Sequence, residues 1–404
     1  MKWEKVKLGD ICKYVTSGGT PKSSIKEYYE PKQIPWLKTK EVNYCRIYET
    51  ESYISKDGLD NSSAKMIPQN SVIVAMYGQG DTAGRVAINK IPLTTNQACC
   101  NLIIDETKAY YEFVYYQLVT LYEKMVSLKN GGAQPNLNAA IIKSIEIKLP
   151  PLKTQRYIAD ILSAYDDLIE NNQKQIKLLE EAAQRLYKEW FVNLRFPGHE
   201  NTKIVDGVPE GWRVASIADI CDTVGGGTPS TKIQSYYEKG DILWVTPTDI
   251  TRNFSLALLD TEKKITPEGL KNSSAKMLPA ETILMTSRAS VGFFGMCKYE
   301  VCTNQGFISC IPKRENLQMY LLFNLKSRVE EIRQKAGGST YLEISKTVFR
   351  ELKIILPKDE VLAEYQKNVH DIFDEIYCRT EMIKSLVDMR NRVLPKLMSG
   401  EVEV

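Results

Sequence analysis

Long apolar runs are missing from this sequence. No stretch of eighteen consecutive apolar residues occurs, whereas a helix needs about twenty to cross a bilayer. The first residues, Met1-Lys2-Trp3-Glu4-Lys5, lead into polar sequence and not into the apolar core of a secretory signal. These absences argue against a membrane partner and against secretion, so we expect a cytoplasmic protein.

Histidine is also scarce, and the cysteines are not spaced for metal binding. The chain has nine cysteines but only two histidines, it contains no C-x-x-C pair, and His199 and His370 lie far apart in the sequence. A structural zinc site needs closely spaced cysteine and histidine ligands. We therefore expect no metal site, and we expect the cysteines to be buried thiols in a reducing compartment.

Signatures of catalysis are absent as well. The sequence lacks the G-x-x-x-x-G-K-[ST] loop that binds nucleoside triphosphates, and it lacks the Asn/Asp-Pro-Pro-aromatic segment of adenine methyltransferases. The glycines of residues 78–84 miss the G-x-G-x-x-G spacing, which favours a loop between strands. The acidic pairs Asp166-Asp167 and Glu180-Glu181 are interpreted as solvated charges on helix surfaces. We therefore predict a recognition or scaffolding protein, not an enzyme, with no catalytic residues and no cofactor of its own.

The net charge of the chain is small. Lysine and arginine exceed aspartate and glutamate by only three residues. A strong basic excess would have indicated a nucleic-acid partner. This balance neither requires nor excludes one.

The most informative feature is that long segments occur twice. The segment NSSAKMIP at 61–68 returns as NSSAKMLP at 272–279, and GGTP at 18–21 returns at 226–229. Further residues recur at nearly the same separation, namely Trp3 with Trp212, Tyr28-Tyr29 with Tyr236-Tyr237, Trp36 with Trp244, and Thr95-Asn96-Gln97 with Thr303-Asn304-Gln305. A period of about two hundred residues is too long for a solenoid. The chain therefore holds two copies of a whole domain.

Each copy ends in a long segment without glycine, at 152–192 and 358–398, and proline occurs there only as Pro395. Apolar residues recur in these segments at alternating steps of four and three, which is typical of a coiled coil. The predicted seam of the first segment is Ile161, Tyr165, Leu168, Asn172, Gln175, Leu179, Ala182 and Leu186. The predicted seam of the second is Tyr365, Val369, Ile372, Ile376, Arg379, Ile383, Leu386, Arg390, Val393 and Leu397. We expect two helices, each roughly 60 Å long, that pack on each other.

The direction of this packing follows from the repeat. Each helix follows its own domain, so a pseudo-two-fold relation between the copies makes the helices antiparallel. The sequence thus predicts an α+β fold in which two similar mixed α/β domains are separated by two long helices forming an antiparallel coiled coil. Polar seam residues, Asn172 and Gln175 on the first helix and Arg379 and Arg390 on the second, are expected to help set the register at some cost in stability. Separate packing of each helix on a globular core is the alternative.

Polar and basic residues at predicted turns are the candidates for recognition. Lysine and arginine can neutralise phosphates, and arginine, glutamine, asparagine and aspartate can read base edges. The DNA-binding candidates of the first copy are Lys38, Thr39, Lys40, Arg46, Lys65, Tyr77, Gln79 and Arg85. Those of the second copy are Thr246, Thr248, Asp249, Arg252, Lys276, Ser287, Arg288 and Lys298. For each of them, plain surface solvation is the alternative. The near-identical segments 61–68 and 272–279 are interpreted as scaffold or phosphate contacts and not as sequence readers.

The order of these motifs carries a resemblance. Gly-Gly-Thr-Pro, Tyr-Tyr, Trp, Thr-Asn-Gln, a strand closing on Leu-Pro and a long helix follow one another twice. This set resembles the specificity subunit of type I restriction–modification systems, over essentially the whole chain. The IENNQ segment at 169–173 is similar to the family's central conserved helix, and GVPEGW at 207–212 to the start of its second recognition domain. The first copy departs from the pattern because it lacks the corresponding Gly-x-Pro-x-Gly run before Trp3.

The resemblance implies a division of the chain into target recognition domains at 1–150 and 212–357, a central long helix at 151–193, a linker at 194–211 and a C-terminal long helix at 358–404. It implies that each domain contacts one half of a bipartite, asymmetric double-stranded DNA sequence, and that the coiled coil sets the spacer between the halves.

The resemblance also implies partners. Two modification subunits, which carry S-adenosylmethionine and the adenine methyltransferase site, are expected to dock on this chain. Restriction subunits with ATP-driven translocation and nuclease activity are expected to join them. Two alternatives remain at this stage, a protein–protein scaffold with tandem binding modules that does not contact DNA, and a stand-alone methyltransferase or nuclease, which the missing motifs disfavour.

Overall fold

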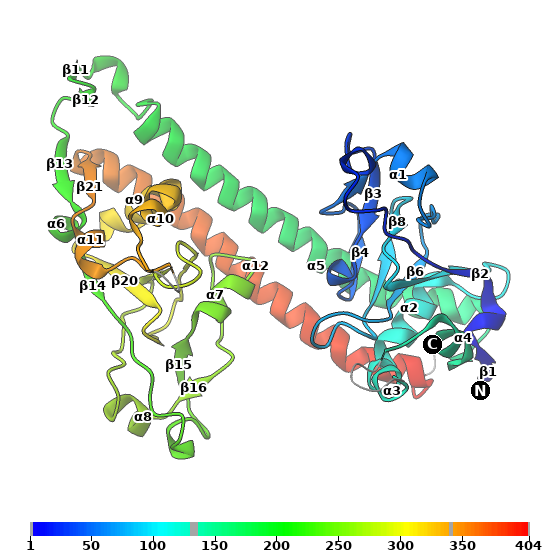
Figure 1. The fold of residues 1–404 in the computed structure, drawn as a ribbon. Coiled ribbons are helices and arrows are strands. Elements are labelled where there is room, and N and C mark those ends of the chain that lie inside the picture. Colours follow the sequence, from blue (N-terminus) through cyan, green and yellow to red (C-terminus); the bar gives the residue numbers. More distant parts are fainter. Residues whose placement is uncertain (1–2, 130–135, 339–341, 403–404) are drawn as a thin grey trace. The chain divides into compact units, whose positions relative to one another are not determined.

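The computed structural model in Figure 1 describes three stretches of chain, residues 3–129, 136–338 and 342–402. Contacts divide the chain into two compact units. Unit 1 comprises Met1–Asp167 with Leu386–Val404, and unit 2 comprises Leu168–Ser385. Each unit therefore combines one mixed α/β domain with the first part of one long helix and the last part of the other.

Unit 1 is built around a five-stranded sheet. Its strands in spatial order are β2 (Cys12–Ser17), β9 (Cys99–Ile104), β6 (Val72–Ala75), β7 (Val86–Asn89) and β4 (Cys45–Ile47). Every residue of β6, β7 and β9 is buried, which explains their nearly continuous apolar sequences, because a strand covered on both faces has no solvated side. A three-stranded sheet has the order β5 (Tyr53–Ile54), β3 (Ile34–Leu37) and β8 (Thr94–Thr95). The remaining elements are β1 (Glu4–Lys7), which pairs with β10 (Glu146–Leu149), and the helices α1 (Lys56–Asp60), α2 (Tyr111–Thr120), α3 (Tyr122–Ser127) and α4 (Ala139–Ser144).

Unit 2 repeats this plan. Its larger sheet has the order β14 (Cys221–Val224), β20 (Phe307–Pro312), β17 (Ile283–Thr286) and β18 (Phe294–Gly295). Its three-stranded sheet has the order β16 (Lys264–Ile265), β15 (Ile242–Val245) and β19 (Cys302–Thr303). The remaining elements are β13 (Arg213–Ser216), which pairs with β21 (Lys353–Leu356), and the helices α6 (Ile217–Ile220), α7 (Pro247–Arg252), α8 (Pro267–Lys271), α9 (Gln318–Ser327), α10 (Val329–Lys335) and α11 (Lys346–Arg350). Within the predicted linker, β11 (Ile204–Val205) and β12 (Val208–Pro209) form a hairpin. The prediction of two similar mixed domains is confirmed.

The two long helices are α5 (Leu152–Tyr187), with 36 residues, and α12 (Asp359–Ser399), with 41 residues. Contacts in unit 2 show that they run antiparallel. Arg379 donates to the Asn172 side chain at 3.1 Å, and the Tyr365 hydroxyl donates to the Ala183 carbonyl at 3.5 Å, so residue numbers rise along one helix as they fall along the other. The predicted antiparallel packing, with Asn172 and Arg379 in the seam, is confirmed. Among the described residues, none of the helices combines the length and the apolar character that a membrane crossing requires.

The predicted seam holds for α12 but is wrong for most of α5. On α5 the buried positions are Gln155, Ile158, Ala159, Leu162, Asp166, Ile169, Asn172, Ile176, Ala183 and Tyr187. Most of those in the predicted seam region lie one residue beyond the predicted positions. Leu168, which was placed in the seam, is 48% exposed. The spacing of four and three residues fits both sets of positions, and the interpretation of Asp166 as solvated rests on the rule that a carboxylate is rarely buried unless it has a partner. The partners come from residues distant in the sequence.

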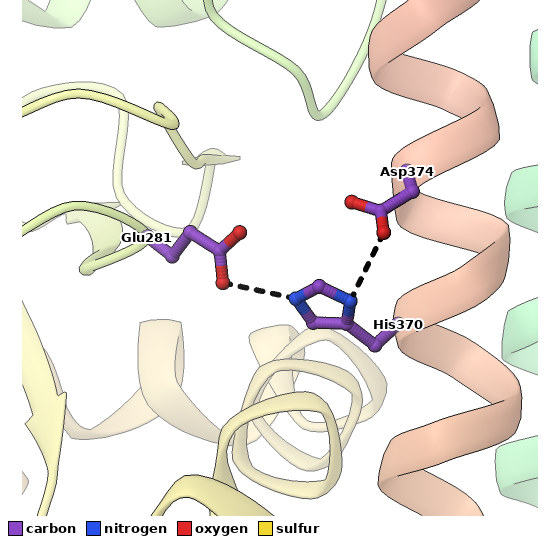
Figure 2. Close-up of side chains that lie close together, drawn as sticks. All are labelled: Glu281, His370 and Asp374. Carbon is purple, nitrogen blue, oxygen red and sulfur yellow. Dashed lines mark hydrogen bonds and ion pairs between the residues drawn. The ribbon is translucent and has the colours of Figure 1, made fainter.

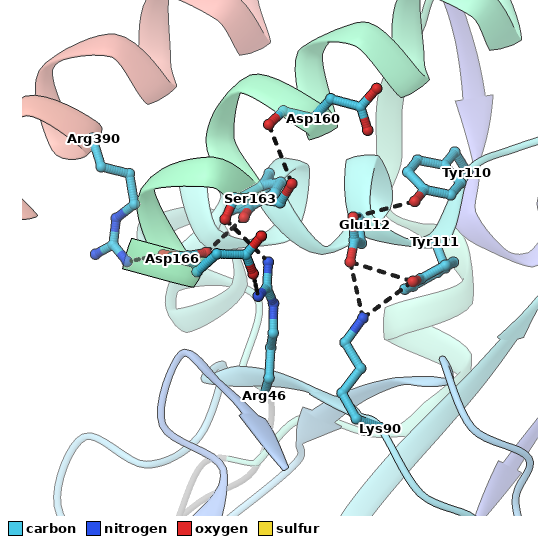
Figure 3. Close-up of polar contacts among 11 residues, drawn as sticks. Arg46, Lys90, Tyr110, Tyr111, Glu112, Asp160, Ser163, Asp166 and Arg390 are labelled. Carbon is cyan, nitrogen blue, oxygen red and sulfur yellow. Dashed lines mark hydrogen bonds and ion pairs between the residues drawn. The ribbon is translucent and has the colours of Figure 1, made fainter. Parts of the chain in front are cut away.

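Asp166 lies at the centre of a buried polar network in unit 1 (Figure 3). Its carboxylate accepts hydrogen bonds from the Tyr116 hydroxyl of α2 at 2.6 Å and from Arg390 of α12 at 2.5 Å. The interpretation of Asp166 as a solvated surface charge is therefore wrong. Glu180 is likewise engaged, since it accepts from the Leu256 amide at 2.7 Å. In unit 1 the network joins the domain to both long helices.

Replacing Arg390 by alanine is expected to lower the free energy of unfolding by about 3 kcal/mol, because it leaves the buried Asp166 charge with Tyr116 as its one remaining donor in the described part of the chain. Denaturant unfolding of the purified chain measures the effect. Arg392→Ala is the matched control, since Arg392 is exposed on the same helix and its loss should change stability by less than about 0.5 kcal/mol. Equal effects of the two substitutions would contradict the role assigned to Arg390.

Candidate functional site

The repeated sequence motifs converge in space, and they do so identically in both units. In unit 1 the Gly19 amide donates to the Thr95 carbonyl at 2.8 Å, and the Trp36 indole donates to the Gly19 carbonyl at 3.0 Å. In unit 2 the corresponding bonds are Gly227 to Thr303 at 2.9 Å and Trp244 to Gly227 at 3.0 Å. The Gly-Gly-Thr-Pro loop is thus clamped between the Thr-Asn-Gln segment and the tryptophan.

Glycine is required in this loop because of its close packing. A Cβ atom on Gly19 would lie 2.2 Å from the Ala64 amide nitrogen, and one on Gly227 would lie 2.2 Å from the Ser274 hydroxyl. Ala64 and Ser274 belong to the duplicated NSSAKM segments. These contacts support the interpretation of the two segments as scaffold. They give a structural reason for the same residues at both places.

The same motifs form one edge of the three-stranded sheets. Strand β3 runs parallel to β8, and β15 runs parallel to β19, so the residues that follow each pair emerge at the same edge. The Asn96 amide donates to the Leu37 carbonyl at 2.9 Å, and the Asn304 amide donates to the Val245 carbonyl at 3.0 Å. The Asn-Gln pair that recurs in both copies therefore lies beside the segment that differs between them, Lys38–Lys40 in unit 1 and the start of α7 in unit 2.

In unit 2 this edge carries an open pocket of about 420 Å³. It brings together two sequence-predicted residues, Thr248 and Arg288, with the repeated Asn304-Gln305 pair; its other lining residues are Pro247, Thr251, Ala289, Ser290 and Gly306. The Thr248 and Arg288 side chains are exposed. Ala289 has a φ of 60°, a left-handed conformation that is strained for alanine and that shapes the turn after β17. Nothing in the sequence singles out Thr251 and Ser290, and Asn304-Gln305 stands out there only as part of the repeat.

Unit 1 offers Tyr77 at the position of Arg288. The Met76 amide donates to the Ala98 carbonyl and the Ser287 amide donates to the Gly306 carbonyl, both at 2.8 Å, which makes the residues that follow Met76 and Ser287 equivalent. Burial raises the pKa of the half-buried Tyr77 hydroxyl, so the group stays a neutral hydrogen-bonding group near neutral pH. A neutral hydroxyl in one unit and a guanidinium in the other would suit different ligands.

The other predicted residues of unit 1 differ in accessibility. Lys40, Lys65 and Gln79 are exposed, Lys38 and Arg85 are half-buried, and Thr39 is buried. The Lys38 ammonium lies 5.0 Å from the centre of the Trp36 ring, and Lys40 pairs with Glu51 on the surface. Arg85 donates to Asp81 at 2.6 Å and to Asn43 at 2.9 Å, and the bond to Asp81 raises its pKa further.

Arg46 has a clear structural role. Its side chain is only 6% exposed, and it pairs with Asp167 of α5 and donates to the Ser163 carbonyl at 3.4 Å (Figure 3). The arginine therefore holds β4 on the long helix. A contact with an external partner would require these bonds to break.

The remaining predicted residues of unit 2 fall into two groups. Arg252 and Lys276 are exposed, and Arg252 lies 3.8 Å from Glu262. Thr246 and Asp249 cap the N-terminus of α7, where the Asp249 carboxylate accepts from the Thr246 amide at 2.8 Å. Ser287 is buried, and Lys298 donates to Asp374 of α12 at 2.6 Å. The structure thus gives Thr246, Asp249, Ser287 and Lys298 positions that serve the fold, and their predicted contacts with DNA remain predictions.

Comparison with known proteins shows which family has a matching sequence. The family model described as "Type I restriction modification DNA specificity domain" matches residues 1–181 and again 209–387. The type I restriction enzyme MjaIX specificity subunit of Methanocaldococcus jannaschii is 29% identical, with 100% of this chain and 94% of that protein covered. The HindI specificity subunit of Haemophilus influenzae is 24% identical, with 99% of each chain covered. The crystal structure of a type I restriction–modification S subunit from M. genitalium shares the fold, with a TM-score of 0.61 at 17% identity over 98% of this chain and 96% of that chain.

Proposed function

Because this chain belongs to the type I restriction–modification DNA specificity family, we propose that it is the non-catalytic subunit that reads the target sequence of such a complex. Each unit reads one half of a bipartite, asymmetric double-stranded DNA site. The matches of the family model to both halves of the chain support two reading domains of the same kind.

The observation that carries the proposal is the pocket in unit 2. It joins side chains that recur in both copies, Asn304 and Gln305, to side chains that differ between them, Thr248 and Arg288. Such a combination suits a surface whose frame is constant and whose specificity varies. An exposed arginine can make two hydrogen bonds to guanine in the major groove, and a threonine can contact a base edge or the thymine methyl group.

The two long helices supply the spacing in this proposal. At 1.5 Å per residue, α5 and α12 are about 54 and 62 Å long. Their antiparallel contacts, such as Arg379 with Asn172, support a stiff connection. A stiff rod between two reading domains would set the length of the unread DNA between the half-sites.

Partner subunits provide the chemistry. We propose that two modification subunits with S-adenosylmethionine, and restriction subunits driven by ATP, assemble on this chain. The net charge of +3 supports this division, because a chain with so little basic excess gains little non-specific DNA affinity by itself. Modification subunits that also contact the duplex would supply the missing charge.

Substituting Arg288 by alanine tests the reading role of the pocket. In a complex with its modification subunits, the variant is expected to lose about 1–3 kcal/mol of discrimination at one base pair of one half-site, with the other half-site unchanged. Competition binding with duplexes that vary at single positions measures this. Arg213→Ala is the control, since Arg213 is exposed on β13 and does not line the pocket. If the variant binds all duplexes equally more weakly, Arg288 contacts a phosphate and does not read a base. If the complex binds DNA equally well with and without this chain, the chain is a protein–protein scaffold.

A further inference from the structure

His370 of α12 lies between two carboxylates in unit 2 (Figure 2). Its Nε2 atom is 3.0 Å from Glu281, which precedes β17, and its Nδ1 atom is 3.4 Å from Asp374, one helical turn further along α12. One ligand atom from each of the three residues can be chosen so that all lie within 4.8 Å of one another. The three side chains are 24%, 29% and 45% exposed for Glu281, His370 and Asp374, so the cluster is accessible to small ions.

The backbone at Glu281 has a conformation that is uncommon for glutamate. Glu281 has a φ of 59°, and the equivalent residue of unit 1, Asn70, has a φ of 63°. The equivalence follows from matching bonds, since the Asn70 amide donates to Asn89 and the Glu281 amide donates to Cys297. Asparagine adopts this left-handed conformation much more readily than glutamate does. Unit 2 thus keeps a carboxylate at a position where the backbone favours asparagine.

The other two members are also specific to unit 2. Gln155 and Gln366 occupy equivalent positions, because each accepts a hydrogen bond from a backbone amide at the start of a domain helix, Tyr110 at α2 and Met319 at α9. Counting from these glutamines, His370 corresponds to Ala159 and Asp374 to Ser163. Unit 1 therefore has asparagine, alanine and serine where unit 2 has glutamate, histidine and aspartate. All three potential ligands are present in unit 2, and all three are replaced in unit 1.

The charges around the cluster favour a cation. Lys298 donates to Oδ1 of Asp374 at 2.6 Å, which orients the carboxylate and leaves Oδ2 facing His370. Glu281 and Asp374 supply two negative charges against the one positive charge of Lys298. A metal ion is bound by an imidazole in its neutral form. One imidazole nitrogen and two carboxylate oxygens form a donor set that suits first-row transition metals better than Mg²⁺ or Ca²⁺, which prefer oxygen ligands alone.

We propose that Glu281, His370 and Asp374 bind one divalent transition-metal ion of the Zn²⁺ class. Ligand bonds of about 2.0–2.2 Å require the three side chains to move closer by rotamer adjustments, with water completing the coordination. The ion would link the turn before β17 to α12, and so would fix the second domain on the helix that carries it. The expectation from the sequence that the chain has no metal site is revised by this proposal.

Histidine resonances provide the sharpest test, because the chain contains only His199 and His370. Full-length protein carrying isotope-labelled histidine is titrated with Zn²⁺ and followed by NMR of the imidazole groups, with binding measured in parallel by calorimetry. We expect one equivalent of Zn²⁺ to shift the His370 signals and leave those of His199 in place. Zn²⁺ at a hundredfold excess over its Kd is expected to raise the Tm by about 5 °C.

Matched variants separate this site from adventitious binding. His370→Ala and the nearly isosteric Glu281→Gln should abolish binding or weaken it by about tenfold or more, while circular dichroism confirms that both fold. His199→Ala and Cys378→Ser, which remove the other histidine and the exposed thiol, should bind as the wild type does. The proposal is wrong if Zn²⁺ leaves the His370 signals unmoved, or if Glu281→Gln binds Zn²⁺ as tightly as the wild type. In either case the three side chains only form hydrogen bonds and ion pairs with one another.

Discussion

Exchanging residues 1–150 for the same segment of a specificity subunit with a different target is expected to change one half of the methylated sequence and leave the other half intact. The reason is that all the sheets of the first domain lie within unit 1, and the edge built by Lys38–Lys40, Tyr77 and Asn96-Gln97 lies within that segment. Mapping of methylated adenines in cells that carry the hybrid with its modification subunits measures the outcome. Every base pair at which the two half-sites differ is expected to switch completely to that of the donor.

The structure defines what the donor segment has to preserve. Unit 1 contains the C-terminal end of α12, and Gln117 donates to the Met398 carbonyl at 3.0 Å while Tyr116 donates to Asp166. A donor that lacks these contacts and Arg46 would fail to pack on the helices. The control is therefore a segment from a specificity subunit that reads the same target sequence. This exchange should leave both half-sites unchanged. Simultaneous loss of both specificities in a folded hybrid would contradict independent reading by the two units.

Inserting one heptad into each long helix is expected to lengthen the spacer between the half-sites by up to three base pairs. Seven residues add about 10 Å of helix, and base pairs stack at about 3.4 Å. Seven residues also keep the seam nearly in phase, since a heptad repeat drifts by only about 20°. Insertion after Ile169 in α5 and after Leu386 in α12 lies between the contacts of Asp166 with Arg390 and of Asn172 with Arg379. Methylation mapping measures the new spacer.

The control for this prediction is a heptad in α5 alone. It shifts Asn172 and Ile176 by two turns past their partners on α12 and should destabilise the chain instead of lengthening the spacer. A doubly inserted chain that folds, methylates DNA and keeps the original spacer would show that the helices do not set the distance.

Several features could be predicted from the sequence because they depend on local or repeated patterns. The duplication of NSSAKM and Gly-Gly-Thr-Pro predicted two domains of one kind, and the structure shows these segments packed together in each unit, Gly19 on Ala64 and Gly227 on Ser274. The absence of glycine from two long segments predicted α5 and α12, because helix propensity and periodicity act over neighbouring residues. The antiparallel direction followed from the order of domain and helix along the chain.

The α5 seam was predicted one position away from its true place, because Asp166 is buried only through Arg390 and Tyr116, which lie 224 and 50 residues away in the sequence. The sequence offers Arg46 as a DNA-binding candidate because it is a basic residue at a predicted turn. Its pairing with Asp167 becomes visible only in the fold. The same holds for Glu281 and His370, 89 residues apart, whose carboxylate and imidazole form a candidate metal site only after the turn before β17 has come together with α12. Periodicity and repetition are properties of the chain and survive in its sequence, whereas the partner of a buried charge is chosen by the packing of distant segments.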